Sequence, residues 1–294
     1  NAYVGVDPDV SVAANVEAAY VRTYEQLYDN HIKDYSSLYD RVDIAINPDE
    51  RFDNKPTPAR LAAYRGGTLD HGLEQIYFNF GRYLLIASSR AGNMPANLQG
   101  LWHNNTDGPW RVDYHNNINL QMNYWPATNT NLLECFTPFV DYVRSLVKPG
   151  ERTARAYYGA RGWTAEVSTN IFGFTAPLNS TQMEWNYNPT AGPWLATQIW
   201  EYYDYTRDDE WLREIGIIKS SANFCADLLY LHEGTYTSAP SFSPEHGSID
   251  LGATYANAVT REILIDAIAA SEILGVDDDL RSEWQEKLDR MYPY

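Results

Sequence analysis

Apolar and aromatic residues recur at helical spacing through most of this chain of 294 residues. Positions three and four apart share one face of a helix, whereas a half-buried strand requires strict alternation. Similar spacing is found in 10–44, 255–274 and 278–291, and strand-like patterns are few. The sequence therefore predicts an all-α fold. The clearest example is the stretch 70–88, whose expected apolar face consists of Leu73, Ile76, Tyr77, Phe80, Tyr83 and Leu84.

Helix boundaries in the middle of the chain are indicated by Pro and by capping residues. Thr137 is a suitable N-cap and Pro138 a suitable first helical residue. We expect that helix to end at Leu146 or Val147, before Pro149. Further helices are expected over 193–206 and 208–231.

Long irregular stretches separate these helices. The segments 159–192 and 235–252 are rich in Gly, Pro, Ser, Thr and Asn and are expected to be loops. Loops of that length in a compact domain are usually functional. Helix pairs joined by long loops favour helical hairpins arranged in a ring, with the loops at one end forming the site.

The stretch 100–125 has the most unusual composition. Its 26 residues include three Trp, two Tyr, two His and six Asn. Buried amides need polar partners, and aromatic rings offer flat apolar faces. A sugar ring satisfies both, so we expect Trp102, Trp125 and Asp113 to contact a carbohydrate. The alternative is a Trp-rich core with satisfied amides.

The charge of the chain limits its partners. There are 39 acidic and 22 basic residues, giving a formal net charge of −17. Nucleic acids and anionic membranes require a positive surface, so neither is expected as a partner. The two cysteines, Cys135 and Cys225, give neither a disulfide framework nor metal-site spacing and are expected in buried helices.

Asn117 and Asn119 stand two residues apart where a helix is expected to begin. In an extended segment both amides would point to one side and orient one water molecule. An amide is a poor base, so a carboxylate must assist, and Asp113 is the nearest in sequence. The alternative is ordinary helix capping and turn formation, which Asn favours.

Glu245 lies in the segment Ser243–Pro244–Glu245–His246. A Glu held in a poorly solvated pocket has a raised pKa and can protonate a leaving oxygen. The alternative is a helix start, with Pro at the first position and Glu next.

His103 and His115 lack metal-site spacing, and no phosphate-binding or nucleophile motif is found, so no metal and no cofactor is expected.

Several longer segments resemble glycoside hydrolase family 95, the α-L-fucosidases and α-L-galactosidases that act on 1,2-linked residues. The resemblance covers nearly the whole chain in family order. It is carried by GRYLLIASSRAGNMPANLQGLW (81–102), DYHNNINLQMNYWPATNTNLLE (113–134), RGWTA (161–165), GPWLATQIWEYYDYTRDDEWL (192–212) and FSPEH (242–246).

The resemblance implies an (α/α)6 barrel and hydrolysis with inversion at the anomeric carbon. It implies that Glu245 is the general acid and that Asn117 and Asn119 orient the attacking water. It places Trp194 against the sugar and His115 beside C6, where an imidazole would fill the space of a 6-hydroxyl and favour fucose. The implied substrate is a glycan with terminal α-L-fucose.

The resemblance also implies that the chain is incomplete. We expect 1–50 to be a helical linker region and 51–294 to be the N-terminal part of the catalytic barrel. The family's second carboxylate, an Asp, would follow residue 294, so the missing remainder of the enzyme is an expected partner. Secretion or periplasmic residence is the family expectation, although no signal peptide is present in the sequence. An α-L-galactosidase and an inactive sugar-binding fragment remain alternatives.

Overall fold

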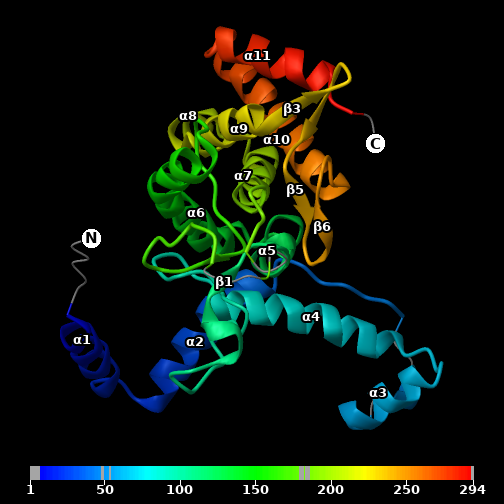
Figure 1. Cartoon of the computed structure of the whole chain (residues 1–294). Helices are drawn as coiled ribbons and strands as arrows, with labels where there is room; N and C mark the ends of the chain where they lie inside the picture. Colours follow the sequence, from blue (N-terminus) through cyan, green and yellow to red (C-terminus); the bar gives the residue numbers. More distant parts are fainter. Residues whose placement is uncertain (1–6, 48–49, 53, 179–181, 183–185, 293–294) are drawn as a thin grey trace. The chain divides into compact units, whose positions relative to one another are not determined.

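The computed structural model describes residues 7–47, 50–52, 54–178, 182 and 186–292, and Figure 1 traces their order along the chain. The chain forms two compact units. Unit 1 consists of Asn1–Ala87 with Asn129–Leu132, and unit 2 consists of Ser88–Thr128 with Leu133–Tyr294. No helix in the described residues is both long and apolar enough to cross a lipid bilayer.

Unit 1 is helical. The predicted helix over 10–44 is two helices, because Thr23 forms a capping box with Gln26 and starts a second helix. The helix predicted over 70–88 is confirmed. The elements are α1 (Pro8–Tyr20), α2 (Tyr24–Tyr39), the 3-10 turn η1 (Glu50–Phe52), α3 (Thr57–Arg65) and α4 (His71–Ser88).

Buried arginines fasten the helices of unit 1. Arg82 of α4 donates hydrogen bonds to the carbonyls of Leu38, Tyr39 and Val42, at the end of α2, over 2.7 to 3.1 Å. A guanidinium satisfies carbonyls that have no partner within the helix and also favours its negative end. Arg60 of α3 binds Asp70, just before α4, through two hydrogen bonds of 2.7 and 2.8 Å.

Unit 2 is built on α7, which packs against α6, α9 and α10 (Figure 1). Leu195 and Ile199 of α7, Phe224 and Cys225 of α9 and Ile263 of α10 are fully buried. The helices of unit 2 are α5 (Asn119–Asn129), α6 (Leu133–Thr153), α7 (Ala191–Thr206), α8 (Asp209–Ile215), α9 (Ile217–Leu228), α10 (Thr254–Leu274) and α11 (Asp278–Asp289). Shorter helical turns are η2 (Pro109–Val112) and the π-type η3 (Ala154–Tyr158).

The helix boundaries predicted around Pro138 and Pro149 were wrong. Both prolines lie inside α6, which begins five residues before Pro138 and continues past Pro149. Proline removes one backbone hydrogen bond and disfavours a helix interior. Here the burial of Phe136, Phe139 and Val143 along one face outweighs that loss. The prediction that Cys135 and Cys225 are buried helix residues is confirmed.

Two further predictions about the C-terminal half were wrong. The helix expected over 208–231 is divided at Gly216, which adopts a left-handed conformation with φ of 58°. The loop expected over 235–252 contains strands. They form two antiparallel hairpins, β3 (Leu229–His232) with β4 (Thr235–Ser238) and β5 (Ser241–Ser243) with β6 (His246–Asp250).

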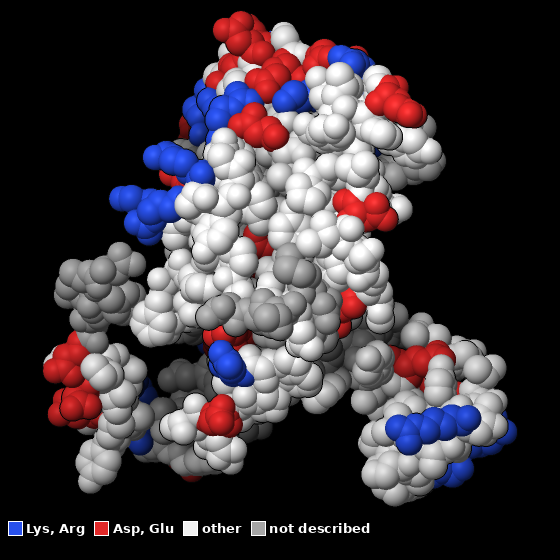
Figure 2. Space-filling model, in the orientation of Figure 1, with Lys and Arg blue, Asp and Glu red and all other residues white. Residues whose placement is uncertain are grey.

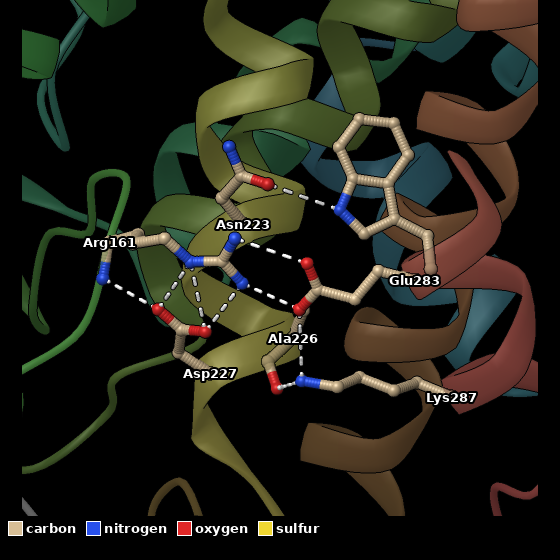
Figure 3. A network of polar contacts seen from close by, with 7 residues as sticks. Arg161, Asn223, Ala226, Asp227, Glu283 and Lys287 are labelled. Atoms are coloured by element: carbon tan, nitrogen blue, oxygen red, sulfur yellow. Dashed lines mark hydrogen bonds and ion pairs between the residues drawn. The ribbon is translucent and has the colours of Figure 1, made fainter. Parts of the chain in front are cut away.

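Arg161 fixes the start of the long 159–192 segment. Its guanidinium donates to Asp227 of α9 over 2.7 to 3.1 Å and to Glu283 of α11 at 2.6 and 3.1 Å (Figure 3). Lys287 extends this cluster, contacting Glu283 at 3.3 Å and the carbonyl of Ala226 at 2.6 Å. A network of several charges contributes more to stability than an isolated surface ion pair. It places the residues that follow, 163–170, against the core.

Candidate active site

A two-stranded sheet positions the segment 113–117. Strand β1 (Tyr114–His115) pairs with β2 (Ser168–Thr169), with His115 opposite Ser168. Asn116 extends the contact, because its backbone N–H donates to the Val167 carbonyl at 2.7 Å and its side chain donates to the Glu166 carbonyl at 2.9 Å. Asn116 is fully buried. The backbone on either side of His115 and Asn117 is therefore held by the 163–170 segment.

The side chains of Asn117 and Glu245 meet, although 128 residues separate them in sequence. Asn117 Nδ2 donates a hydrogen bond to Glu245 Oε1 at 2.9 Å. Asn117 is buried, and its Oδ1 has no hydrogen-bond partner among the described residues. A buried acceptor without a partner is costly unless a ligand or water satisfies it. The arrangement thus offers one open acceptor beside a carboxylate.

Glu245 occupies the tip of the β5–β6 hairpin. Ser243 pairs with His246, so Pro244 and Glu245 form the turn between the strands. The helix start considered as an alternative is wrong, because the hairpin continues directly from this turn. Glu245 is exposed, so the expectation of a poorly solvated pocket around its side chain is wrong for the described residues. Desolvation of this carboxyl requires something beyond the described residues to cover it.

Asn119 is the first residue of α5, as the sequence indicated, and Asn117 lies in the turn that precedes it. Asn119 is half-buried, whereas Asn117 is almost fully buried. The segment between the two amides is thus a turn that leads into a helix, and it is not the extended segment that would point both amides to one side. Their joint action on one water stays a prediction.

His115 is half-buried between carboxylates. Burial lowers the pKa of its imidazole, while the Trp110 carbonyl and the charges of Asp113 and Glu245 act in the opposite direction. Burial also raises the pKa of Asp113, opposed by His115 and Arg111. His115 is therefore favoured in its neutral form, which can both donate and accept a hydrogen bond.

The tryptophans assigned to the site differ in their surroundings. Trp194 is half-buried on α7, with its ring edge-to-face against Tyr255 of α10 and 5.3 Å between centroids. Trp102 and Trp125 are 52% and 43% exposed. Exposed indole faces are available to a ligand, but contact of these three residues with a sugar remains a prediction.

Sequence reasoning assigned no role to Glu166, which is 1% exposed. Its carboxylate accepts hydrogen bonds from the Tyr158 hydroxyl and from the Asn188 backbone N–H, the latter at 2.6 Å. The available signal was a charged residue between the apolar residues Ala165 and Val167. Among the described residues, no group of three or more His, Cys, Asp or Glu side chains is arranged to hold a metal ion.

Structural comparison defines the class of fold. A putative kojibiose phosphorylase from the human microbiome matches 73% of this chain and 31% of its own, with a TM-score of 0.56 and 11% sequence identity. At that identity the likeness concerns the fold alone. Together with the helices described above, it confirms the predicted all-α toroid.

Sequence comparison identifies the family. Residues 23–294 match the model of the glycosyl hydrolase family 95 catalytic domain. Alpha-L-fucosidase 2 of Arabidopsis thaliana is 34% identical over an alignment of 290 positions that covers 93% of this chain and 34% of that protein. Probable alpha-fucosidase A of Aspergillus niger is 35% identical over an alignment of 253 positions that covers 83% of this chain and 32% of that protein. The chain belongs to glycosyl hydrolase family 95.

The chain spans about a third of the length of these curated relatives. The family match begins at residue 23, within the segment 1–50 that we expected to be a linker. The boundary near residue 50 stays a prediction.

Proposed function

We propose that the protein containing this chain is an inverting glycoside hydrolase that releases terminal α-L-fucose from 1,2-linked glycans. The observation that carries the proposal is the hydrogen bond between Asn117 and Glu245, which brings the expected acid and the expected water-holding amide to one place. The fucosidase names of its relatives support the substrate class.

In this proposal Glu245 donates its proton to the glycosidic oxygen while water attacks the opposite face of the sugar. Asn117 and Asn119 hold that water, and the open Oδ1 of Asn117 accepts one of its protons in a hydrogen bond. The sugar enters between acid and amide and replaces their direct contact. The same sugar removes water from around Glu245, which favours the protonated acid.

Inversion also requires a base for the attacking water, normally a second carboxylate ~6.5–9.5 Å from the acid. An amide cannot take the proton. From the family resemblance we assign this role to an Asp that follows residue 294 in the longer relatives. The neutral His115 is assigned to the C6 side of the sugar, where its ring favours fucose over L-galactose.

A neutral glycan suits the surface of unit 2. The face shown in Figure 2 has charged side chains mainly around its edge and at the end formed by α11, and its middle is largely uncharged. Uncharged polar and aromatic surfaces suit sugars, which carry no charge to be paired.

From the family we also propose a secreted or periplasmic location.

The first test is Glu245→Gln in the full-length enzyme. We expect turnover of a 1,2-linked fucoside to fall by at least about 10²-fold, the usual contribution of a general acid. Glu233→Gln is the matched control, because Glu233 is an exposed Glu at the turn of the neighbouring β3–β4 hairpin. Near-normal turnover by Glu245→Gln on natural fucosides would refute the assigned role.

Two assays separate this proposal from its alternatives. Rates on fucosyl and L-galactosyl forms of one aglycone distinguish a fucosidase from an α-L-galactosidase. Calorimetry with fucose beside a product assay identifies a fragment that binds sugar without cleaving it. Binding without hydrolysis by the full-length protein would exclude the catalytic proposal.

A further inference from the structure

Glu166 is a buried carboxylate to which the proposed mechanism gives no role. It contacts two donors, the Tyr158 hydroxyl of η3 and the Asn188 backbone N–H. Its own backbone is fixed as well, because its N–H donates to the Thr175 carbonyl at 3.1 Å. A buried carboxylate satisfied on both oxygens is held in one orientation.

Glu166 connects two parts of the candidate site. On one side, its backbone carbonyl accepts a hydrogen bond from the Asn116 side chain, and Asn116 directly precedes Asn117. On the other side, its carboxylate holds Asn188, whose side-chain amide donates to the Tyr255 hydroxyl at 3.4 Å. Tyr255 in turn packs edge-to-face against Trp194. A single residue thus links the amide that faces Glu245 to the tryptophan expected to pack on the sugar.

We propose that Glu166 is a positioning residue that sets the sugar platform, Trp194 with Tyr255, relative to Asn117. The proposal rests on the proposed function, since the platform is defined by the sugar it would bind. Glu166 does not touch the reacting atoms, because it is almost fully buried behind Asn188 and Tyr158. Its role is to fix the distance between two groups that touch the substrate from different sides.

The burial of Glu166 makes its hydrogen bonds to Tyr158 and Asn188 sensitive to pH. Burial raises the pKa of Glu166 to about 7, opposed by the hydrogen bonds from Tyr158 and Asn188. The titratable groups that face it are Tyr158 of η3, Tyr187 of the 186–190 segment and Tyr255 of α10. Each of these phenols has a pKa raised by burial, so all three stay neutral while Glu166 titrates. Protonation turns one carboxyl oxygen of Glu166 into an O–H donor. The hydrogen bond that this carboxyl accepts from the Tyr158 hydroxyl is then changed.

The test compares Glu166→Gln and Glu166→Ala in the full-length enzyme on a 1,2-linked fucoside between pH 5.5 and 8.5. Glu166→Ala leaves the Asn188 N–H and the Tyr158 hydroxyl without partners, and we expect KM to rise about 10-fold, with a smaller change in kcat. Glu166→Gln keeps the size and neutral polarity of the protonated acid. We expect the parent enzyme to show a change of KM near pH 7, and we expect Glu166→Gln to fold and to lose that change.

Asp266→Asn is the matched control, because Asp266 is also a buried carboxylate of unit 2 but lies within α10 and does not contact Glu166 or Asn188 in any described hydrogen bond. We expect its KM and pH profile to match the parent enzyme. A folded Glu166→Ala with parental KM, or a Glu166→Gln with a parental pH profile of KM, would overturn the proposal.

A crystal structure of the Glu166→Ala protein gives a readout that is independent of substrate. Displacement of the Asn188 and Tyr255 side chains by more than about 1 Å supports positioning, since misplacement on this scale is what impairs a site. Unchanged side chains would overturn it. If the parent enzyme neither binds nor cleaves fucosides, the proposed function fails, and this structural result still decides whether Glu166 positions Trp194 and Tyr255.

Discussion

Asp266 is a buried carboxyl group whose burial lowers the stability of the folded state. It lies in α10 with 2% of its surface exposed, and its Oδ2 has no hydrogen-bond partner among the described residues. Burial raises its pKa to about 9, and the negative charges of Glu262 and Asp204 act in the same direction. At neutral pH the native carboxyl is therefore protonated, whereas an unfolded Asp is ionised.

This difference gives the free energy of unfolding a pH dependence of known sign. The folded pKa lies above the unfolded value, so the contribution is fully present below about pH 4 and is lost as pH rises toward 9. We expect Asp266→Asn, which cannot ionise, to flatten this decline and to stabilise the protein at pH 8 by about 1–3 kcal/mol.

Urea unfolding at pH 5, 7 and 8.5 measures this effect. Glu272→Gln on the same helix is an exposed control, for which we expect a change of less than about 0.5 kcal/mol at each pH. An Asp266→Asn protein with the parental slope of stability against pH would contradict the assignment.

At the scale of elements, the 159–192 segment depends on how closely it approaches α9. Gly162 has φ of +66°, and a Cβ at this position would lie 1.8 Å from the carbonyl oxygen of Ser220. Only glycine allows this approach, which places Arg161 next to Asp227 and Glu283 (Figure 3). Gly159 has a similar φ of +62°, but a Cβ there would meet nothing within 4 Å.

We expect Gly162→Ala to lower the free energy of unfolding by at least about 2 kcal/mol, because backbone strain and a steric clash act together. Gly159→Ala adds the strain of a left-handed conformation without the clash, so we expect a loss of about 1–2 kcal/mol. Chemical denaturation of both variants gives the comparison. Equal losses for the two variants would show that the close approach to Ser220 is unimportant.

At the scale of the whole molecule, the excess of 39 acidic over 22 basic residues opposes compaction. The acids are concentrated in places such as α11, which contains Asp278, Asp279, Glu283, Glu286 and Asp289 (Figure 2). Like charges repel over about one Debye length, which is ~30 Å at 0.01 M and ~8 Å at 0.15 M ionic strength. Salt therefore screens a net repulsion in this protein.

We expect Tm to rise between 0.01 and 0.15 M NaCl by roughly 1–4 °C, corresponding to less than about 1 kcal/mol. Differential scanning calorimetry over this range of NaCl concentrations measures this shift. A fall in Tm on adding NaCl would mean that ion pairs such as those of Arg161 outweigh the general repulsion.

Much of the fold could be predicted from the sequence because several helices carry their own signals. The helices α4 and α10 have continuous apolar spacing, and each was predicted to within a residue or two at either end. Local rules failed where tertiary burial opposes them. Pro138 and Pro149 indicate a helix start and stop, yet packing of Phe136 and Phe139 keeps α6 helical through both.

The candidate site was predicted only in part. Motif resemblance selected Asn117 and Glu245, but no local signal indicates that their side chains meet or that Glu245 lies on a hairpin turn. Glu166 was assigned no role from the sequence. Its proposed positioning role depends on its burial and on hydrogen bonds from Tyr158 and Asn188, which lie 8 and 22 residues away.

The sequence by itself determined the helical class, the acidic net charge and the family, because periodicity, charge and motifs can be read from the order of the residues. Only the tertiary structure decided which side chains meet in the candidate site and which carboxyls have a raised pKa. Burial and hydrogen bonding set the pKa values of Glu166 and Asp266, and both depend on segments distant along the chain.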